Sequence, residues 1–128
     1  MGGERPRVLV VNDDAPLAET VRRLLCSEGY DARVAGDGIE AVEAFADWPA
    51  DLILLDLLMP RLDGWGFLQQ RATDPALQRA PVLVWSVAPA EELERARNLG
   101  ATECLPRAAT TPDLLLDSVA RLVGQPPS

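Results

Sequence analysis

The chain has 128 residues, of which 48% are hydrophobic and 25% charged, a length and composition typical of one globular domain and unlike a disordered chain. No stretch approaches the roughly 18 consecutive apolar residues of a membrane span, and the N-terminus lacks a signal-peptide pattern, so we expect a cytoplasmic protein without membrane contact. The formal net charge of −8 repels nucleic acid and disfavours direct binding to it.

Residue usage excludes further classes of chemistry. All 12 basic residues are arginine, so mechanisms that need a reactive lysine are excluded. The two cysteines, Cys26 and Cys104, do not form a CxxC pair, and no histidine is present to complete a zinc site with them. We therefore expect reduced, buried thiols.

The first half of the chain alternates between strand and helix patterns. Residues 7–11 form an apolar, β-branched run that ends at a polar cluster, as a buried strand would. Apolar residues then recur at helical spacing over 17–25. Residues 32–35 indicate a second strand, Asp37 is expected to cap the next helix, and residues 52–55 indicate a third strand.

The same alternation continues to the C-terminus. A helix is predicted over 65–72, a strand over 82–85 and another helix over 89–99. Residues 104–105 indicate a minimal fifth strand, and Thr111 is expected to cap a final amphipathic helix.

Five short strands separated by helices favour a parallel sheet, because parallel neighbours need long crossover connections. Right-handed crossovers place helices on both faces, which predicts an α/β fold, a doubly wound (βα)5 sandwich. We expect one domain over residues 7–124, with an N-terminal extension at 1–6 and a C-terminal tail at 125–128. In such sheets the ligand site lies beyond the carboxyl ends of the strands.

Polar residues follow four of the five predicted strands at these ends. They are Asn12 and Asp13 after the first strand, Asp56 after the third, Ser86 after the fourth and Arg107 after the fifth. Converging carboxylates repel each other unless a cation lies between them, and Mg²⁺ prefers oxygen ligands and keeps several waters. The sequence therefore predicts a Mg²⁺ site.

A carboxylate beside such a cation can attack an electrophilic phosphorus atom. Asp56 is the best candidate nucleophile. The Ser86 hydroxyl and the Arg107 guanidinium are suited to bind phosphoryl oxygens. Each residue taken alone would be an ordinary turn or surface residue, so the hypothesis depends on the combination.

Segment 51–64, Asp-Leu-Ile-Leu-Leu-Asp-Leu-Leu-Met-Pro-Arg-Leu-Asp-Gly, closely resembles the phosphoacceptor segment of bacterial response-regulator receivers. The resemblance runs without gaps over 8–123 and includes Gly36-Asp-Gly-Ile-Glu-Ala and Pro81-Val-Leu-Val-Trp-Ser. It implies a flavodoxin-like, chemotaxis-regulator-like fold with strand order 2-1-3-4-5, which is the strand order of the chemotaxis regulator itself.

The resemblance also implies roles for individual residues. Asp56 is similar to the phosphorylation site, Asp13 to a direct metal ligand, the Leu58 backbone carbonyl to a second ligand, and Asn12 to a ligand acting through water. The phosphoryl donor would be a sensor histidine kinase or a phosphotransfer protein in a phosphorelay. At most, such a domain phosphorylates itself from small phosphodonors and dephosphorylates itself, so we do not expect an enzyme in the usual sense.

Three positions depart from the family pattern. Asn12 stands where the family has an acidic residue, so we expect weakened Mg²⁺ binding; pairing Asp13 with Asp14 instead is less favoured. Arg107-Ala108 replaces a Lys-Pro pair whose bond is typically cis, so we expect a trans bond and an Arg107 side chain free to point elsewhere. Cys104 replaces the switch aromatic, so the usual ring rotation cannot operate.

Trp85 is an unusual neighbour of Ser86, with two interpretations: a packing residue on a strand, or an anchor that contacts a partner. Too few residues follow Val123 for an effector domain, so we expect output through a downstream protein target. The face formed by the strand at 104–105 and its flanking helices is the expected surface, including for a homodimer.

Three alternatives to a phosphoacceptor receiver remain. The first is a phosphorylation-independent pseudo-receiver that acts as a protein-binding scaffold, which the departures at Asn12, Arg107 and Cys104 would suit. An aspartate-nucleophile phosphatase resembles a pattern with a second Asp where this chain has Leu58. A nucleotide or flavin binder would need a glycine- or hydroxyl-rich phosphate loop in place of the acidic cluster after the first strand.

Overall fold

Five parallel strands form the central sheet in the computed structural model, which describes residues 5–123. The strand order β2-β1-β3-β4-β5 confirms the fold predicted from the sequence. The strands are β1 Arg7–Val11, β2 Asp31–Ala35, β3 Leu52–Leu55, β4 Val82–Ser86 and β5 Glu103–Pro106. Most of the expected extension at 1–6, Gly124 and the tail at 125–128 lie outside the described residues.

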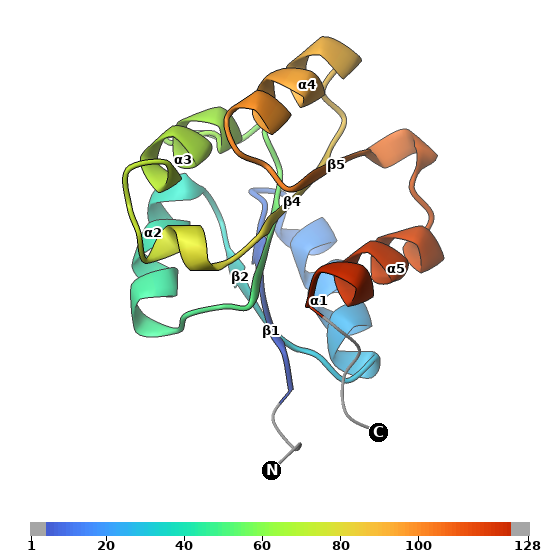
Figure 1. The fold of residues 1–128 in the computed structure, drawn as a ribbon. Helices are drawn as coiled ribbons and strands as arrows, with labels where there is room; N and C mark the ends of the chain where they lie inside the picture. The colour runs from blue at the N-terminus through green and yellow to red at the C-terminus, as the bar shows by residue number, and fades with distance from the viewer. Residues whose placement is uncertain (1–4, 124–128) are drawn as a thin grey trace.

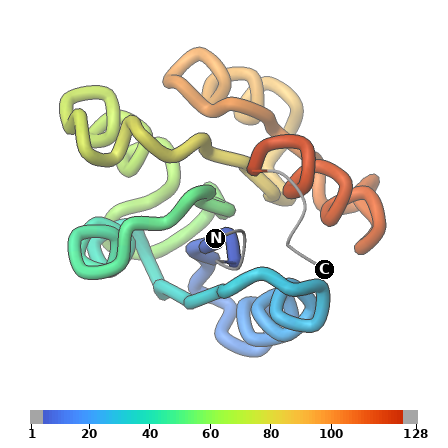
Figure 2. The backbone as a smooth tube through the Cα atoms, turned by 60° about the horizontal axis from the view of Figure 1, so that its bottom comes forward, coloured from blue at the N-terminus to red at the C-terminus, as the bar shows by residue number. Residues whose placement is uncertain are grey.

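Helices cover both faces of this sheet (Figures 1 and 2). One face carries α1 and α5, and the other carries α2, α3 and α4, as the figures show from two directions. The helices are α1 Ala15–Ser27, α2 Gly38–Asp47, α3 Gly64–Arg71, α4 Ala90–Asn98 and α5 Pro112–Val123. Two 3-10 turns, η1 Leu77–Arg79 and η2 Arg107–Ala109, are additions that the sequence pattern did not predict.

The alternation of side chains along each strand divides the apolar core into two layers. On β1, Val8 and Val10 belong to the layer beneath α1 and α5, whereas Leu9 and Val11 belong to the layer beneath the other three helices. Strands buried on both faces read as continuous apolar runs, which is why residues 52–55 were recognisable as a strand.

Aspartate side chains begin three helices. Asp37 caps α2 as expected, and its carboxylate accepts a hydrogen bond from the Glu40 backbone N–H at 2.9 Å. Asp14 caps α1 and Asp63 caps α3, neither of which was anticipated. The Thr111 hydroxyl accepts from the Leu114 N–H at 3.2 Å, which confirms its predicted cap. The predicted strands 7–11 and 52–55 match the structure, and the other predicted boundaries differ by one or two residues, as frayed element ends usually do.

An ion pair ties the start of α2 to the loop between β3 and α3. Arg61 adopts a left-handed backbone with φ of 61°, and its Nε donates to the Asp37 carboxylate at 2.6 Å. In the same region the Gly38 N–H donates to the Leu62 carbonyl at 2.9 Å. The loop that follows Asp56 is therefore held against α2.

We expect the Asp37–Arg61 pair to stabilise the fold at neutral pH and to lose this effect in acid. The hydrogen bond from Glu40 and the Arg61 guanidinium hold the pKa of Asp37 below its usual value. A lowered folded-state pKa adds stability above the unfolded value of about 3.9 and loses it as pH falls through the folded value. Asp37→Asn keeps a capping oxygen but removes the charge. In urea unfolding, the variant should be less stable than the parent at pH 7, and the difference should narrow steadily as pH falls below about 3.9. A difference that does not narrow in acid would contradict the charge argument.

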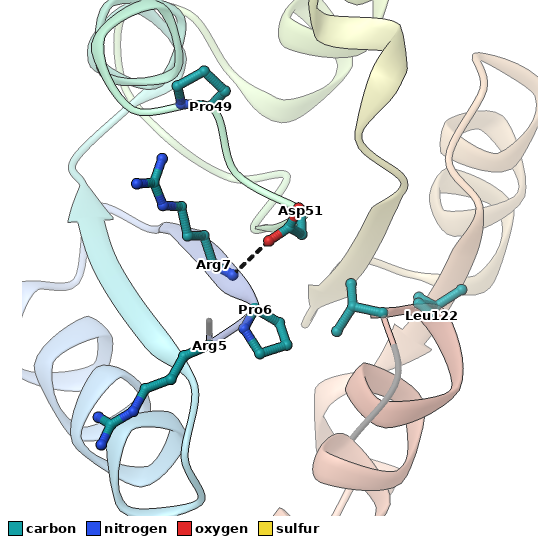
Figure 3. A pocket seen from close by; sticks show the side chains of 7 residues that line it. Arg5, Pro6, Arg7, Pro49, Asp51 and Leu122 are labelled. Atoms are coloured by element: carbon teal, nitrogen blue, oxygen red, sulfur yellow. Dashed lines mark hydrogen bonds between the residues drawn. The ribbon is translucent and has the colours of Figure 1, made fainter. Parts of the chain in front are cut away.

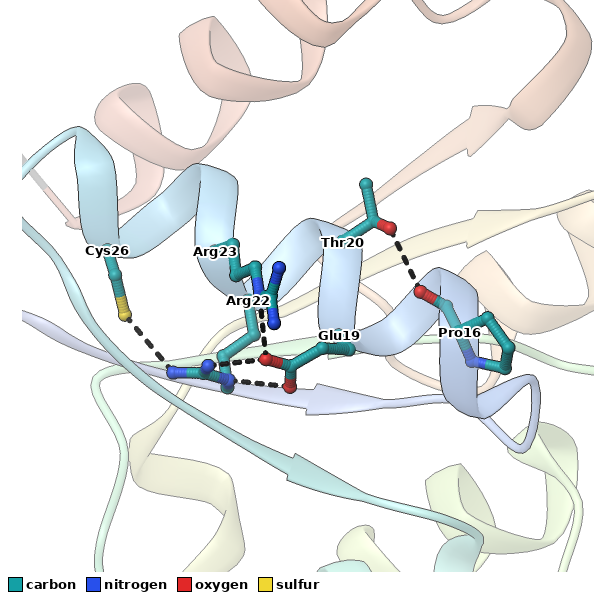
Figure 4. A network of polar contacts seen from close by, with 6 residues as sticks. All are labelled: Pro16, Glu19, Thr20, Arg22, Arg23 and Cys26. Atoms are coloured by element: carbon teal, nitrogen blue, oxygen red, sulfur yellow. Dashed lines mark hydrogen bonds and ion pairs between the residues drawn. The ribbon is translucent and has the colours of Figure 1, made fainter.

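The exposed side of α1 carries a separate polar network (Figure 4). Glu19 pairs with Arg22 and Arg23, and these guanidinium groups lower its pKa to about 2. Arg22 Nη1 also lies 3.7 Å from the Cys26 sulfur. Cys104 is buried as expected, but Cys26 is only half-buried, because it lies at the edge of this solvent-facing network. No helix within residues 5–123 has the length and apolar character needed to cross a membrane.

Candidate functional site

The strand register brings the predicted polar residues to one edge of the sheet. Val11 pairs with Leu55, so Asn12 and Asp56 leave adjacent strands at the same level. The Asp56 N–H donates to the Val11 carbonyl at 2.9 Å, which extends this pairing by one residue. Ser86 pairs with Pro106 on the other side, so Arg107 begins η2 just beyond Ser86.

Asp56 is a buried carboxylate with only 6% of its surface exposed. Its Oδ1 lies 3.4 Å from the Leu58 backbone N–H and 3.5 Å from Arg107 Nη2. Burial raises the pKa of Asp56, and the hydrogen bond from Ser86 and the charge of Arg107 only partly oppose this effect. Ser86 and Arg107 therefore do not fully replace the hydration that the Asp56 carboxylate loses on burial.

Ser86 is fully buried at the end of β4. Its hydroxyl accepts a hydrogen bond from the Ala88 N–H at 3.3 Å and lies close enough to the Asp56 carboxylate to oppose the rise in the pKa of Asp56. The end of β4 thus places the hydroxyl beside the carboxylate.

Arg107 does not point away from the site, so that expectation was wrong. Its Nη2 donates to the Trp85 carbonyl at 3.1 Å and lies beside Asp56. The guanidinium carbon lies 4.4 Å from the centre of the Trp85 ring. The Arg107–Ala108 bond is trans, as predicted. The side chain is thus directed by Trp85, a residue for which the sequence suggested only packing or partner contact.

Oxygen donors for a cation come mainly from the loop after β1. Asp13 is exposed, whereas Asn12 is buried and its Oδ1 accepts from the Asp14 N–H at 2.9 Å. The Asp14 carboxylate is occupied as the cap of α1, where it accepts from the Leu17 N–H at 3.1 Å. Asn12 and Asp14 therefore each accept one hydrogen bond within this loop, whereas the Asp13 side chain accepts none from the described residues.

The chemistry of this donor set suits Mg²⁺, which takes few carboxylates and keeps several waters. Within residues 5–123, no three His, Cys, Asp or Glu side chains gather to form a metal site by themselves. A cation would therefore need the amide of Asn12, a backbone carbonyl and water in addition to the carboxylates of Asp13 and Asp56. Leu58, whose carbonyl is the expected donor, is 47% exposed and open to solvent.

A cavity of about 620 Å³ lies at the opposite end of the sheet (Figure 3). Its wall includes Arg7 at the start of β1 and Asp51 just before β3, and the Asp51 carboxylate accepts from the Arg7 N–H at 2.8 Å. Because ligands of open parallel sheets bind beyond the carboxyl ends of the strands, this cavity is not part of the site around Asp56.

Comparison with known proteins agrees with this geometry. Residues 8–119 match the response regulator receiver domain. Response regulator MprA of Mycobacterium ulcerans (strain Agy99) is 39% identical over 112 residues, which cover 85% of this chain and 47% of that protein. MprA of Mycobacterium sp. (strain KMS) is 38% identical over the same length and coverage. The chain spans about half the length of these curated relatives.

Solved structures show the same fold. Chemotaxis protein CheY4 of Vibrio cholerae is 26% identical with a TM-score of 0.84, covering 93% of this chain and 99% of that chain. A response regulator signal receiver domain from Bermanella marisrubri is 30% identical with a TM-score of 0.85, covering 94% and 99%. The chain belongs to the response regulator receiver domain family. Members of this family are signalling domains rather than conventional enzymes.

Proposed function

We propose that Asp56 accepts a phosphoryl group from a sensor histidine kinase or a phosphotransfer protein. The observation that carries this proposal is a buried carboxylate at a strand end, with the Ser86 hydroxyl and the Arg107 guanidinium directed at it. An Asp56 oxygen would form the new bond to phosphorus while the bond from phosphorus to the donor's histidine nitrogen breaks. The product is an aspartyl phosphate.

Receiver domains generally depend on Mg²⁺, and the oxygen donors here fit that ion. Asp13, Asp56 and the Leu58 carbonyl would hold it directly, and Asn12 through water. A bound Mg²⁺ supplies positive charge to the phosphoryl oxygens. The protein's own contribution is to keep Asp56 desolvated and to place two donors, Ser86 and Arg107, where the phosphoryl oxygens arrive.

Output would pass to a downstream protein target through the face formed by α4, β5 and α5. On this face Arg121 of α5 pairs with Glu103 of β5 at 2.8 Å, and Leu114 is exposed. If the downstream target is a second copy of this chain, the same face would form a homodimer. The alternative, a scaffold that works without phosphorylation, is not favoured by the family match.

The decisive experiment is intact-mass analysis after incubation with acetyl phosphate, with and without Mg²⁺. We expect one added phosphoryl group in the parent protein, only with Mg²⁺ present, and none in Asp56→Asn. Asp51→Asn is the matched control, because it makes the same change at an exposed position on the other end of β3 and should leave the adduct intact. No adduct in the parent, together with no response to millimolar Mg²⁺, would support the scaffold instead.

A further inference from the structure

The sequence neighbours of Arg107 do not restrict its long side chain to a position beside the Asp56 carboxylate. It is followed by Ala108 and starts a short 3-10 turn, η2, and its flexible side chain has many rotamers available. Its Nε is buried and has no hydrogen-bond partner among the described residues. The side chain is nevertheless only 22% exposed and directed toward Asp56. A contact outside the carboxylate must therefore hold it there.

Trp85 provides that contact in two ways. Its carbonyl accepts the hydrogen bond from Arg107 Nη2 at 3.1 Å, and its ring lies 4.4 Å from the guanidinium carbon. A guanidinium that lies over an indole face is attracted to the ring, and the ring blocks its movement in that direction. The distance from Nη2 to Asp56, 3.5 Å, is by contrast too long for a strong hydrogen bond.

The Trp85 ring is itself held by packing rather than by its polar atom. Its Nε1 is buried without a hydrogen-bond partner among residues 5–123. The ring packs against the core layer beneath α1 and α5 and lines a small apolar groove with Leu17, Val21 and Leu115. The indole is thus fixed by its packing and supports the Arg107 guanidinium, while the next residue, Ser86, faces Asp56.

We propose that Trp85 is the positioning residue for the phosphoryl-binding cation: its ring and carbonyl hold Arg107 over Asp56. This proposal rests on phosphoryl transfer to Asp56. In it, the stack substitutes for backbone constraint after β5, so the guanidinium is in place before the phosphoryl group arrives. When it does, the free Nε and Nη groups of Arg107 bind the new oxygens without leaving the ring.

The test is the second-order rate of adduct formation from subsaturating acetyl phosphate with Mg²⁺, followed by intact mass. Trp85→Leu should lower this rate about 10-fold, the size of a partly desolvated cation–π contact. Trp85→Phe keeps an aromatic face and loses only an unpartnered N–H, so its rate should stay within about 3-fold of the parent. In an Arg107→Ala background, Trp85→Leu should have no further effect, because the residue that it positions is gone.

Trp48→Leu is the matched control. Arg7 and Arg33 lie over the Trp48 ring at 5.2 and 4.7 Å, so this change also removes tryptophan–arginine stacking. Arg7 begins β1, at the end of the sheet opposite to Asp56, so the rate should not change. Urea midpoints of all variants verify folding. Equal losses from Trp85→Leu with and without Arg107, or a Trp85→Phe rate as low as that of Trp85→Leu, would overturn the positioning role. A parent protein that forms no adduct would overturn phosphoryl transfer and the positioning role together, and the mass spectrum distinguishes that case.

Discussion

Replacing Gly64 with alanine is expected to lower the free energy of unfolding by about 3 kcal/mol or more. A methyl group at Gly64 would lie 2.6 Å from the Leu57 Cα and 2.7 Å from the Asp56 carbonyl oxygen. These are backbone atoms next to β3, and Asp56 is fixed by its hydrogen bond to Val11. Neither can move away as the end of a flexible side chain would, so the fold must strain or the loop must shift.

Gly36→Ala is the matched control for this change. Its added methyl group would meet the Glu40 carboxylate at 3.2 Å, which is the end of a flexible side chain that can give way. We expect a change of about 1 kcal/mol or less there. Urea unfolding monitored by circular dichroism compares the two variants. If Gly64→Ala unfolds within about 1 kcal/mol of the parent, the close approach of α3 to the loop is not rigid.

Replacing Asn12 with aspartate is expected to raise the affinity for Mg²⁺ about 10-fold or more, the usual size of an outer-sphere effect. One carboxylate oxygen can keep the hydrogen bond from the Asp14 N–H that Asn12 now accepts, and the other adds a negative charge beside Asp13 and Asp56. Without Mg²⁺ the same charge is buried among like charges, so the variant should unfold more easily than the parent in chelator.

Calorimetric titration with Mg²⁺ measures the first effect, and urea unfolding with and without chelator measures the second. Asn98→Asp adds an identical charge at an exposed position at the end of α4 and should leave the affinity unchanged. An affinity that does not rise in Asn12→Asp would mean that residue 12 takes no part in cation binding, even through water.

The fold and the location of the candidate site could be predicted because both depend on local patterns. Apolar runs such as 52–55 indicate buried strands, and parallel strands carry their terminal residues to one edge, so Asn12, Asp56 and Ser86 were bound to be neighbours. The orientation of Arg107 was not predictable from its sequence neighbours, because it depends on a ring on another strand. Register offers a partial signal: Trp85 pairs with Leu105, so the tryptophan lies on the neighbouring strand close to the point where Arg107 leaves β5.

The hydrogen bonds in the loop after β1 could not be predicted from the sequence either. An acidic cluster such as 12–14 suggests three equivalent oxygen donors, yet Asp14 serves α1 and Asn12 closes a turn onto it. Of residues 12–14, Asp13 is the one whose side chain accepts no hydrogen bond from the described part of the chain, which follows from where α1 begins rather than from composition.

The arginine beside Asp56 also avoids two reactions, deprotonation and acetylation, that would remove the positive charge of a lysine amine. A guanidinium group, unlike a lysine amine, stays protonated throughout the pH range in which proteins are folded. Nor does it react readily with acyl donors, whereas a lysine amine can lose its charge by acetylation. Acetyl phosphate carries both an acyl and a phosphoryl group, so under the proposed function its phosphoryl group would pass to Asp56 while the neighbouring positive charge stays intact.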